Sequence, residues 1–135
     1  KKVLSIVDFD ESITKYGHED TLFALQLKKE NFNITHIENH VIHEGLENNV
    51  EFINKTKVAV ENLNELVRIK KLDPSYVKLF KTYRFLEKTK LTFIMRMFTS
   101  FFIRLCFKKL QLKNPKIFWF DVFKLFYLIK VRDNV

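Results

Sequence analysis

The sequence is poor in the residues that cross-link or interrupt a chain. It has one cysteine, Cys106, and a single thiol excludes both an internal disulfide and a thiolate metal site. Two glycines and two prolines in 135 residues, with 47% of residues hydrophobic, exclude the disordered and collagen-like classes. The length suits one domain with a modest core, in which we expect Cys106 to pack as an apolar side chain.

The two halves of the chain differ in the sign of their net charge. Residues 1–66 hold seven Lys or Arg against twelve Asp or Glu, a balance of −5. Residues 67–135 hold seventeen against four, a balance of +13, and they carry eleven of the fifteen phenylalanines. The net charge of +8 is therefore the average of two unlike parts, and we expect two functional regions.

No apolar run is long enough and free enough of charge to predict a membrane span. The densest run, LTFIMRMFTSFFIRLCF at residues 91–107, is about the length of a short span. Arg96 and Arg104 interrupt it, and an arginine at the centre of a span costs about 2.5–3.5 kcal/mol on insertion scales. We therefore expect an interfacial helix rather than a spanning one.

Hydrophobic spacing predicts a mostly helical chain. The predicted helices cover residues 21–32, 48–72, 75–89, 90–111 and 116–131. Asp20 or Thr21 is the expected cap of the first helix, because a short side-chain oxygen can accept from free backbone N–H groups. The β-branched, alternating residues 34–43 predict an extended segment that ends near Gly45, and the apolar residues 4–7 suit a strand or the approach to a loop.

Two pairs of acids, Asp8/Asp10 and Glu19/Asp20, are the candidates for chemistry. The first pair resembles the opening motif of haloacid-dehalogenase-type phosphatases, with Asp8 as nucleophile and Asp10 as acid/base. No Gly-Asp-x-x-x-Asp-like segment follows, however, and Glu11-Ser12 stands where that motif has Gly-Thr. A D-x-D metal site is a second possibility, and a solvated loop whose acids turn the chain is the interpretation we favour for this pair.

The second pair lies in a longer resemblance. Residues 9–47, FDESITKYGHEDTLFALQLKKENFNITHIENHVIHEGLE, resemble the acceptor side of bacterial family-two glycosyltransferases, which build cell-surface polysaccharides. The specific elements are GHED and the downstream V-I-H, and the resemblance continues through residues 48–66 and more loosely into residues 114–128. In this family the phrase F-D-E precedes a G-x-E-D motif at the start of a helix, so Phe9-Asp10-Glu11 would be scaffold around the site.

The resemblance implies a role for each residue of the motif. Asp20 would be the general base that takes the proton from an acceptor sugar hydroxyl, and a positioned carboxylate contributes roughly 10²–10⁴-fold. Glu19 would hydrogen-bond the acceptor or the helix end, Gly17 would let the backbone turn, and His18 would line the acceptor cleft. His43 would reach a divalent metal, Mn²⁺ or Mg²⁺, on the donor diphosphate; a structural histidine at a strand end is the alternative for this residue.

The resemblance also implies a fold and a reaction. The fold would be a predominantly helical α/β fragment: residues 1–72 as the acceptor-side part of a GT-A-like catalytic domain, then residues 73–135 as a basic, aromatic-rich helical region. The family's nucleotide-binding strands and D-x-D precede GHED by on the order of a hundred residues, so we expect a C-terminal piece of a longer enzyme. The reaction would be inverting transfer of a hexose from a nucleotide sugar to a glycan or lipid-linked acceptor.

The basic aromatic tail leaves several hypotheses open. Its phenylalanines would pack against the catalytic region, or they would sit on a membrane surface beside cationic flanks. The second hypothesis predicts a cytoplasmic enzyme that is peripheral on the inner face of the cell membrane. Nucleic acid is disfavoured, because the aromatics lie in apolar runs without polar spacing. The alternative to an enzyme is a non-catalytic membrane-docking and acceptor-binding module or remnant.

Overall fold

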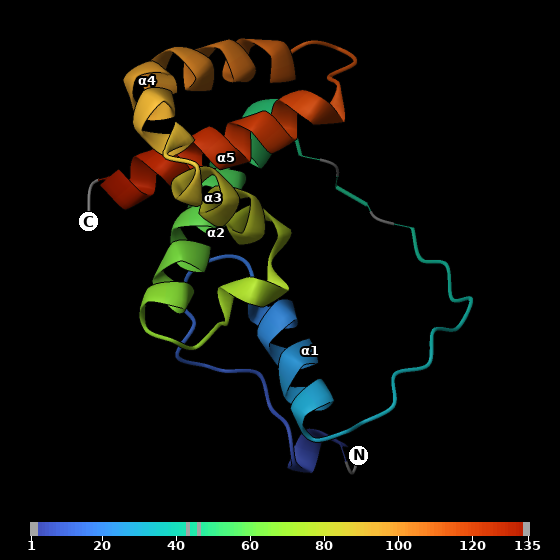
Figure 1. The fold of residues 1–135 in the computed structure, drawn as a ribbon. Coiled ribbons are helices and arrows are strands. Elements are labelled where there is room, and N and C mark those ends of the chain that lie inside the picture. Colours follow the sequence, from blue (N-terminus) through green and yellow to red (C-terminus); the bar gives the residue numbers. More distant parts are fainter. Residues whose placement is uncertain (1–2, 43, 46, 134–135) are drawn as a thin grey trace.

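In the described residues the chain folds into helices joined by short connections and two longer non-helical segments, residues 6–18 and 30–42. The computed structural model describes residues 3–42, 44–45 and 47–133. In these ranges the elements are the 3₁₀ helices η1 (Val3–Ser5) and η2 (Pro74–Tyr76) and the α-helices α1 (Glu19–Lys29), α2 (Asn49–Arg68), α3 (Lys78–Lys88), α4 (Leu91–Leu110) and α5 (Ile117–Asp133). Figure 1 shows α4 at one end of the molecule and α1 at the other, with residues 32–42 in a loop that swings away from the helices.

The expected α/β fragment with half of a GT-A-like fold is wrong, because the described residues contain no strand. A strand requires a neighbouring strand to exchange backbone hydrogen bonds with. The apolar residues 4–7 instead enter η1 and the turn after it, where the N–H groups of Ile6 and Val7 both donate to the carbonyl of Val3 at 2.9 Å. Residues 34–42 are neither helical nor paired in a ladder. Alternation in the sequence therefore marked segments that have no strand partner within the described chain.

The five predicted α-helices are confirmed, with shifts at their ends. The side chain of Asn48 caps α2 by accepting from the backbone N–H of Glu51 at 3.0 Å. That helix ends at Arg68 rather than near Asp73, because Lys70 takes a left-handed conformation with φ 61°. The N–H of Lys71 then bonds back to the carbonyl of Leu66 at 2.9 Å, which closes a Schellman-type end.

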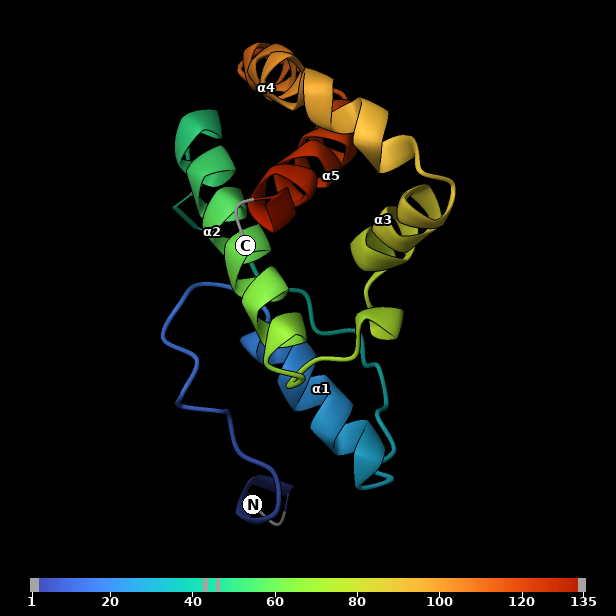
Figure 2. The same cartoon turned by 60° about the vertical axis from the view of Figure 1, so that its left-hand side comes forward.

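Helix α5 is the centre of the packing. It lies between α2 on one side and α3 and α4 on the other (Figure 2) and contacts all three. One group of buried side chains, which joins α5 to α1, α2 and α3, comprises Leu22, Val60, Leu63, Leu66, Leu72, Phe80, Tyr83, Leu128 and Ile129. A second group, which joins α5 to α2 and α4, comprises Ile53, Cys106, Leu110 and Phe123. The core is thus built from residues on both sides of position 72.

Polar contacts fix how α5 meets its neighbours. The hydroxyl of Tyr127 on α5 donates to the carboxylate of Glu61 on α2. Burial, together with the nearby Glu61 carboxylate, raises the pKa of Tyr127, so the phenol keeps its proton. At the other side of α5, Arg96 of α4 forms an ion pair with Asp133 at 2.6 Å. These contacts set the rotation of α2 and α4 about the central helix.

Helix α4 contains the densest apolar run of the sequence. Its bounds agree with the predicted helix over residues 90–111. Within the described ranges, no helix combines the length and the apolar character that crossing a membrane requires. The prediction that Arg96 and Arg104 rule out a spanning helix is consistent with this finding.

Candidate functional site

The turn that precedes α1 is seated on α2. Gly17 has φ 98°, in the left-handed region that favours glycine, and a Cβ at this position would lie 2.9 Å from the Cβ of Ala59. The buried amide of Asn62 donates to the carbonyl of Gly17 at 2.6 Å and to that of Lys15 at 3.2 Å. Residues of α2 on a single face therefore hold the backbone of this turn in place.

His18 follows in the same turn and directly precedes α1. Its backbone is also left-handed, with φ 74°, and its carbonyl accepts the first helical bond from Leu22 at 3.0 Å. Burial lowers the pKa of the His18 imidazole, while Asp20, Glu19 and a hydrogen bond with the backbone of Ala59 act in the opposite direction. The ring is therefore held mainly neutral against α2, and its side chain does not cap the helix.

Asp20 lies in the first turn of α1, with its carboxylate exposed to solvent. The expected caps Asp20 and Thr21 are thus inside the helix. Oδ1 of Asp20 accepts from the backbone N–H of Thr21 at 2.7 Å and from its hydroxyl at 3.3 Å. Oδ2 takes part in neither bond.

Asp20 stands at one end of an open groove of about 880 Å³ that runs beside α1. The groove is lined by Asp20, Thr21, Ala24, Leu25, Lys28, Asn31, Phe32, Asn33, Ile34 and Tyr76. The helical members run from Asp20 to Lys28 on one side of α1, so the groove follows the helix for about 12 Å. Its lining combines a carboxylate, two amides, an ammonium group and aromatic rings. This combination can orient a polar ligand through hydrogen bonds and pack its apolar faces on rings.

The far end of the groove is formed where α1 stops. Asn31 adopts φ 57° and its N–H donates to the carbonyl of Lys28 at 3.1 Å, which ends the helix. Tyr76 comes from η2, whose first turn is capped by the Asp73 carboxylate accepting from the N–H of Ser75 at 2.7 Å. The ammonium group of Lys28 lies 5.2 Å from the centre of the Tyr76 ring, a cation–π contact across the groove.

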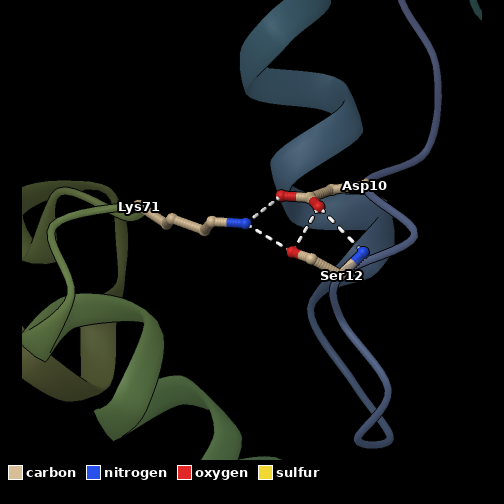
Figure 3. Close-up of polar contacts among 3 residues, drawn as sticks. All are labelled: Asp10, Ser12 and Lys71. Atoms are coloured by element: carbon tan, nitrogen blue, oxygen red, sulfur yellow. Dashed lines mark hydrogen bonds and ion pairs between the residues drawn. The ribbon is translucent and has the colours of Figure 1, made fainter.

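The FDE segment before the motif is fastened to the helices on both sides. Phe9 stacks on Phe23 of α1 with ring centres 4.5 Å apart. Oδ1 of Asp10 accepts from the N–H and the hydroxyl of Ser12 at 3.0 and 2.5 Å (Figure 3). Lys71 donates to Oδ2 of Asp10 at 2.6 Å and to the Ser12 hydroxyl at 2.5 Å. These bonds, Lys71 first, lower the pKa of Asp10 from 3.8 to about 2.

A divalent metal, implied by the resemblance, has no matching donor set in the described part of the chain. No group of three or more His, Cys, Asp or Glu side chains there could hold a metal ion. Asp10 is engaged with Lys71 and Ser12, so the D-x-D formed by Asp8 and Asp10 does not present two free carboxylates. His43, the predicted metal ligand, lies outside the described residues. No chemical step is therefore assigned to a metal.

The structure separates the four residues of the GHED motif. Asp20 lines the groove, whereas Gly17 and His18 lie against α2 and Glu19 is exposed outside the lining. The acceptor-binding roles of Gly17, His18 and Glu19 stay predictions.

Sequence reasoning missed the other groove residues. Tyr76 follows Asp20 by more than fifty positions, and nothing local to it indicates a shared site. Asn31 gave a usable signal, since an asparagine just after a helical pattern favours a left-handed helix end.

We predict that Gly17→Ala lowers the free energy of unfolding more than Gly45→Ala does. Both glycines have positive φ, 98° and 77°, so both changes carry backbone strain of about 1–2 kcal/mol. Only at position 17 does the new Cβ meet a neighbour, and relief of such a clash costs roughly 1–3 kcal/mol more. Urea unfolding of both variants measures the difference. The double variant Gly17→Ala/Ala59→Gly should lose less free energy of unfolding than the sum of its single changes. Equal losses for Gly17→Ala and Gly45→Ala would contradict the close packing of this turn on α2.

We predict that Lys71→Gln raises the pKa of Asp10 from about 2 toward 3.8, whereas Lys70→Gln leaves it unchanged. A carboxyl whose pKa is lower in the folded chain stabilises the fold above its unfolded pKa. This contribution is lost as the pH falls from about 4 to about 2. In Lys71→Gln the folded and unfolded pKa values of Asp10 should lie closer together, so the pH range over which stability is lost should be narrower. A carbon-detected NMR titration of the Asp10 carboxyl gives the pKa. An unshifted titration in Lys71→Gln would mean that the ion pair does not form in solution.

Comparison with known proteins adds no family assignment to these geometric findings. The chain matches no protein-family model, and searches of curated proteins and of solved structures found no match.

Proposed function

We propose that this chain is the acceptor-side portion of an inverting glycosyltransferase, which moves a hexose from a nucleotide sugar to a hydroxyl of a glycan or lipid-linked glycan. The proposal gives Asp20 the role of general base and the groove beside α1 the role of acceptor site. It assigns the nucleotide-sugar donor to protein outside these residues, as the resemblance of residues 9–47 to family-two glycosyltransferases implies.

The observation that carries the proposal is the position of Asp20 at the end of a groove with the chemistry of a sugar site. The amides of Asn31 and Asn33 can each donate and accept, which matches hydroxyl groups that also do both. The half-exposed ring of Tyr76 offers a flat apolar surface to the C–H face of a pyranose. The motif acid implied by the resemblance and the groove found in the structure thus meet at one residue.

The proposed step needs few groups of this chain. The acceptor hydroxyl oxygen forms a bond to the anomeric carbon, the bond from that carbon to the diphosphate breaks, and the nucleoside diphosphate leaves. The hydroxyl proton passes to Asp20, at Oδ2, because Oδ1 is occupied by both bonds from Thr21. Attack from the face opposite the leaving group inverts the anomeric configuration. The groove contributes by holding the hydroxyl near the carboxylate in a fixed orientation, so that the reacting groups do not have to meet by diffusion.

A non-catalytic acceptor-binding module is the second candidate. The groove is formed wholly by residues of this chain, so it can bind a glycan whether or not a donor is bound elsewhere. Asp20 would then act only as a hydrogen-bond acceptor toward the sugar. Both candidates predict glycan binding in the groove, and only the enzyme predicts turnover of a nucleotide sugar.

For the enzyme, we predict that Asp20→Asn lowers turnover by roughly 10²–10⁴-fold, because an amide cannot take the hydroxyl proton. The matched control is Asp8→Asn, an acid that is also exposed but lies outside the groove, and this variant should keep wild-type turnover. The assay is release of nucleoside diphosphate from a panel of UDP- and GDP-hexoses by the protein as its gene encodes it. Full activity in Asp20→Asn would remove the base assignment, and absence of turnover with retained glycan binding would favour the module. Loss of phosphate release from p-nitrophenyl phosphate in Asp8→Asn would favour the phosphatase instead.

We predict that Tyr76→Ala raises KM for the acceptor by about tenfold and leaves kcat nearly unchanged, because ring packing contributes equally to the ground and transition states. The control is Tyr16→Ala, whose ring is equally exposed but lies outside the groove. Acceptor titration at saturating donor gives both constants. A change in kcat alone would show that Tyr76 does not contribute to acceptor binding.

A further inference from the structure

Helix α4 presents many of its apolar side chains outward and part of its polar side chains inward. The outer face of α4, as named here, consists of Phe93, Ile94, Met97, Phe98 and Phe101, all exposed. Phe93 and Met97 are 70% and 76% exposed, whereas Thr99 on the inner side is 6% exposed. An ordinary surface helix has the reverse distribution, with its apolar stripe toward the core. The outer face is therefore a contiguous apolar surface that the fold does not cover.

Packing fixes this orientation, so it is not an alternative rotation of a loose helix. Phe102 of α4 stacks on Phe126 of α5 with ring centres 4.5 Å apart and an interplanar angle of 11°. Cys106 is fully buried in the same interface. The inward Thr99 satisfies its hydroxyl by donating to the carbonyl of Met95 at 3.0 Å. The ion pair between Arg96 and Asp133 holds the start of α4 on the end of α5.

The charge around the outer face is mainly positive, with Arg96 paired to Asp133. Residues 88–120 contain no acid and eight cationic residues: Lys88, Lys90, Arg96, Arg104, Lys108, Lys109, Lys113 and Lys116. Arg104 and Lys108 continue the line of Met97 and Phe101 by helical spacing, and Lys90 directly precedes the helix. Cations thus flank the apolar stripe at both ends, where long side chains can reach polar headgroups while the rings enter an apolar layer.

We infer that the outer face of α4 docks on the surface of a bilayer that contains anionic phospholipid, with the helix lying in the plane of the interface. Figures 1 and 2 both show α4 along an outer edge of the molecule, with no other helix drawn outside it. Apolar side chains that protrude between cationic ends suit an interfacial helix, whose binding combines buried apolar area with attraction to anionic headgroups.

The charge favours lipid over a second copy of the chain. Pairing two outer faces would bring two sets of these cations together, and only Arg96 among them has an acid, Asp133, as an ion-pair partner. An anionic headgroup layer supplies the missing sign over the whole length of the helix. The inference does not depend on the glycosyltransferase proposal, because the groove residues do not belong to α4.

Vesicle co-sedimentation of the 135-residue chain tests the inference. Wild type should bind vesicles of equal parts phosphatidylcholine and phosphatidylglycerol, and binding should weaken with salt. The variant Phe93→Gln/Met97→Gln/Phe101→Gln should bind these vesicles at least about tenfold more weakly. Its matched control is Ile37→Gln/Val41→Gln/Ile42→Gln, which alters three apolar loop residues that are even more exposed and should bind as wild type does.

The charge component has its own pair of variants. Arg104→Gln/Lys108→Gln/Lys109→Gln should reduce binding on the order of a hundredfold at low salt, since each cation near an anionic surface contributes separately. Lys29→Gln/Lys70→Gln/Lys81→Gln removes the same charge outside residues 88–120 and should have a smaller effect. Circular dichroism confirms that each variant keeps its helices.

Two results would overturn the inference. The first is equal vesicle binding by wild type and the α4 apolar variant. The second is absence of vesicle binding together with self-association in sedimentation equilibrium that the apolar variant abolishes, which would identify a second copy as the occupant.

Discussion

The packing of α2 against α5 is the contact on which the rest of the molecule depends. Within the described residues there is no sheet, so helices can bury their apolar stripes only against one another. Leu63 of α2 and Leu128 of α5 belong to one buried group, and Ile53 and Phe123 belong to the other. Helix α2 contacts both the core and the turn before α1. Leu63 faces the core, and its neighbour Asn62 holds the backbone of the turn before α1. The position of Asp20 therefore depends on how α2 packs in the core.

Asp10 and Asp20, one acid from each pair, differ in their surroundings. Asp10 is tied to Lys71 across a sequence separation of 61 residues and is held ionised by that contact. Asp20 accepts hydrogen bonds from its neighbour Thr21 and lines an open groove. A carboxylate already neutralised by an ammonium group is a poor acceptor for a substrate proton. Of the two, Asp20 is therefore the one whose environment leaves it available for chemistry.

Helices could be predicted from this sequence and strands could not, for a physical reason. A helix closes its hydrogen bonds within a few residues, so the spacing of Val60, Leu63 and Val67 carries enough information to indicate α2. A strand is completed by a partner distant in sequence, and residues 34–42 have none in the described chain. The groove was unpredictable for the same reason, because Tyr76 reaches it through the tertiary fold. Asp20 was predicted only through the motif that surrounds it.

Helices α4 and α1 lie at opposite ends of the molecule in both views, and this separation affects which molecules at a membrane could reach the groove beside α1 (Figures 1 and 2). If α4 rests on a bilayer, the bulk of α5 and α2 stands between the lipid surface and the groove beside α1. The groove then opens at a height above the headgroups instead of among them. If the groove is the acceptor site, as proposed, a sugar attached directly to a lipid would lie too low to enter it, whereas the outer end of an already extended glycan would reach it. The arrangement would thereby select acceptors by their length before any hydroxyl is recognised.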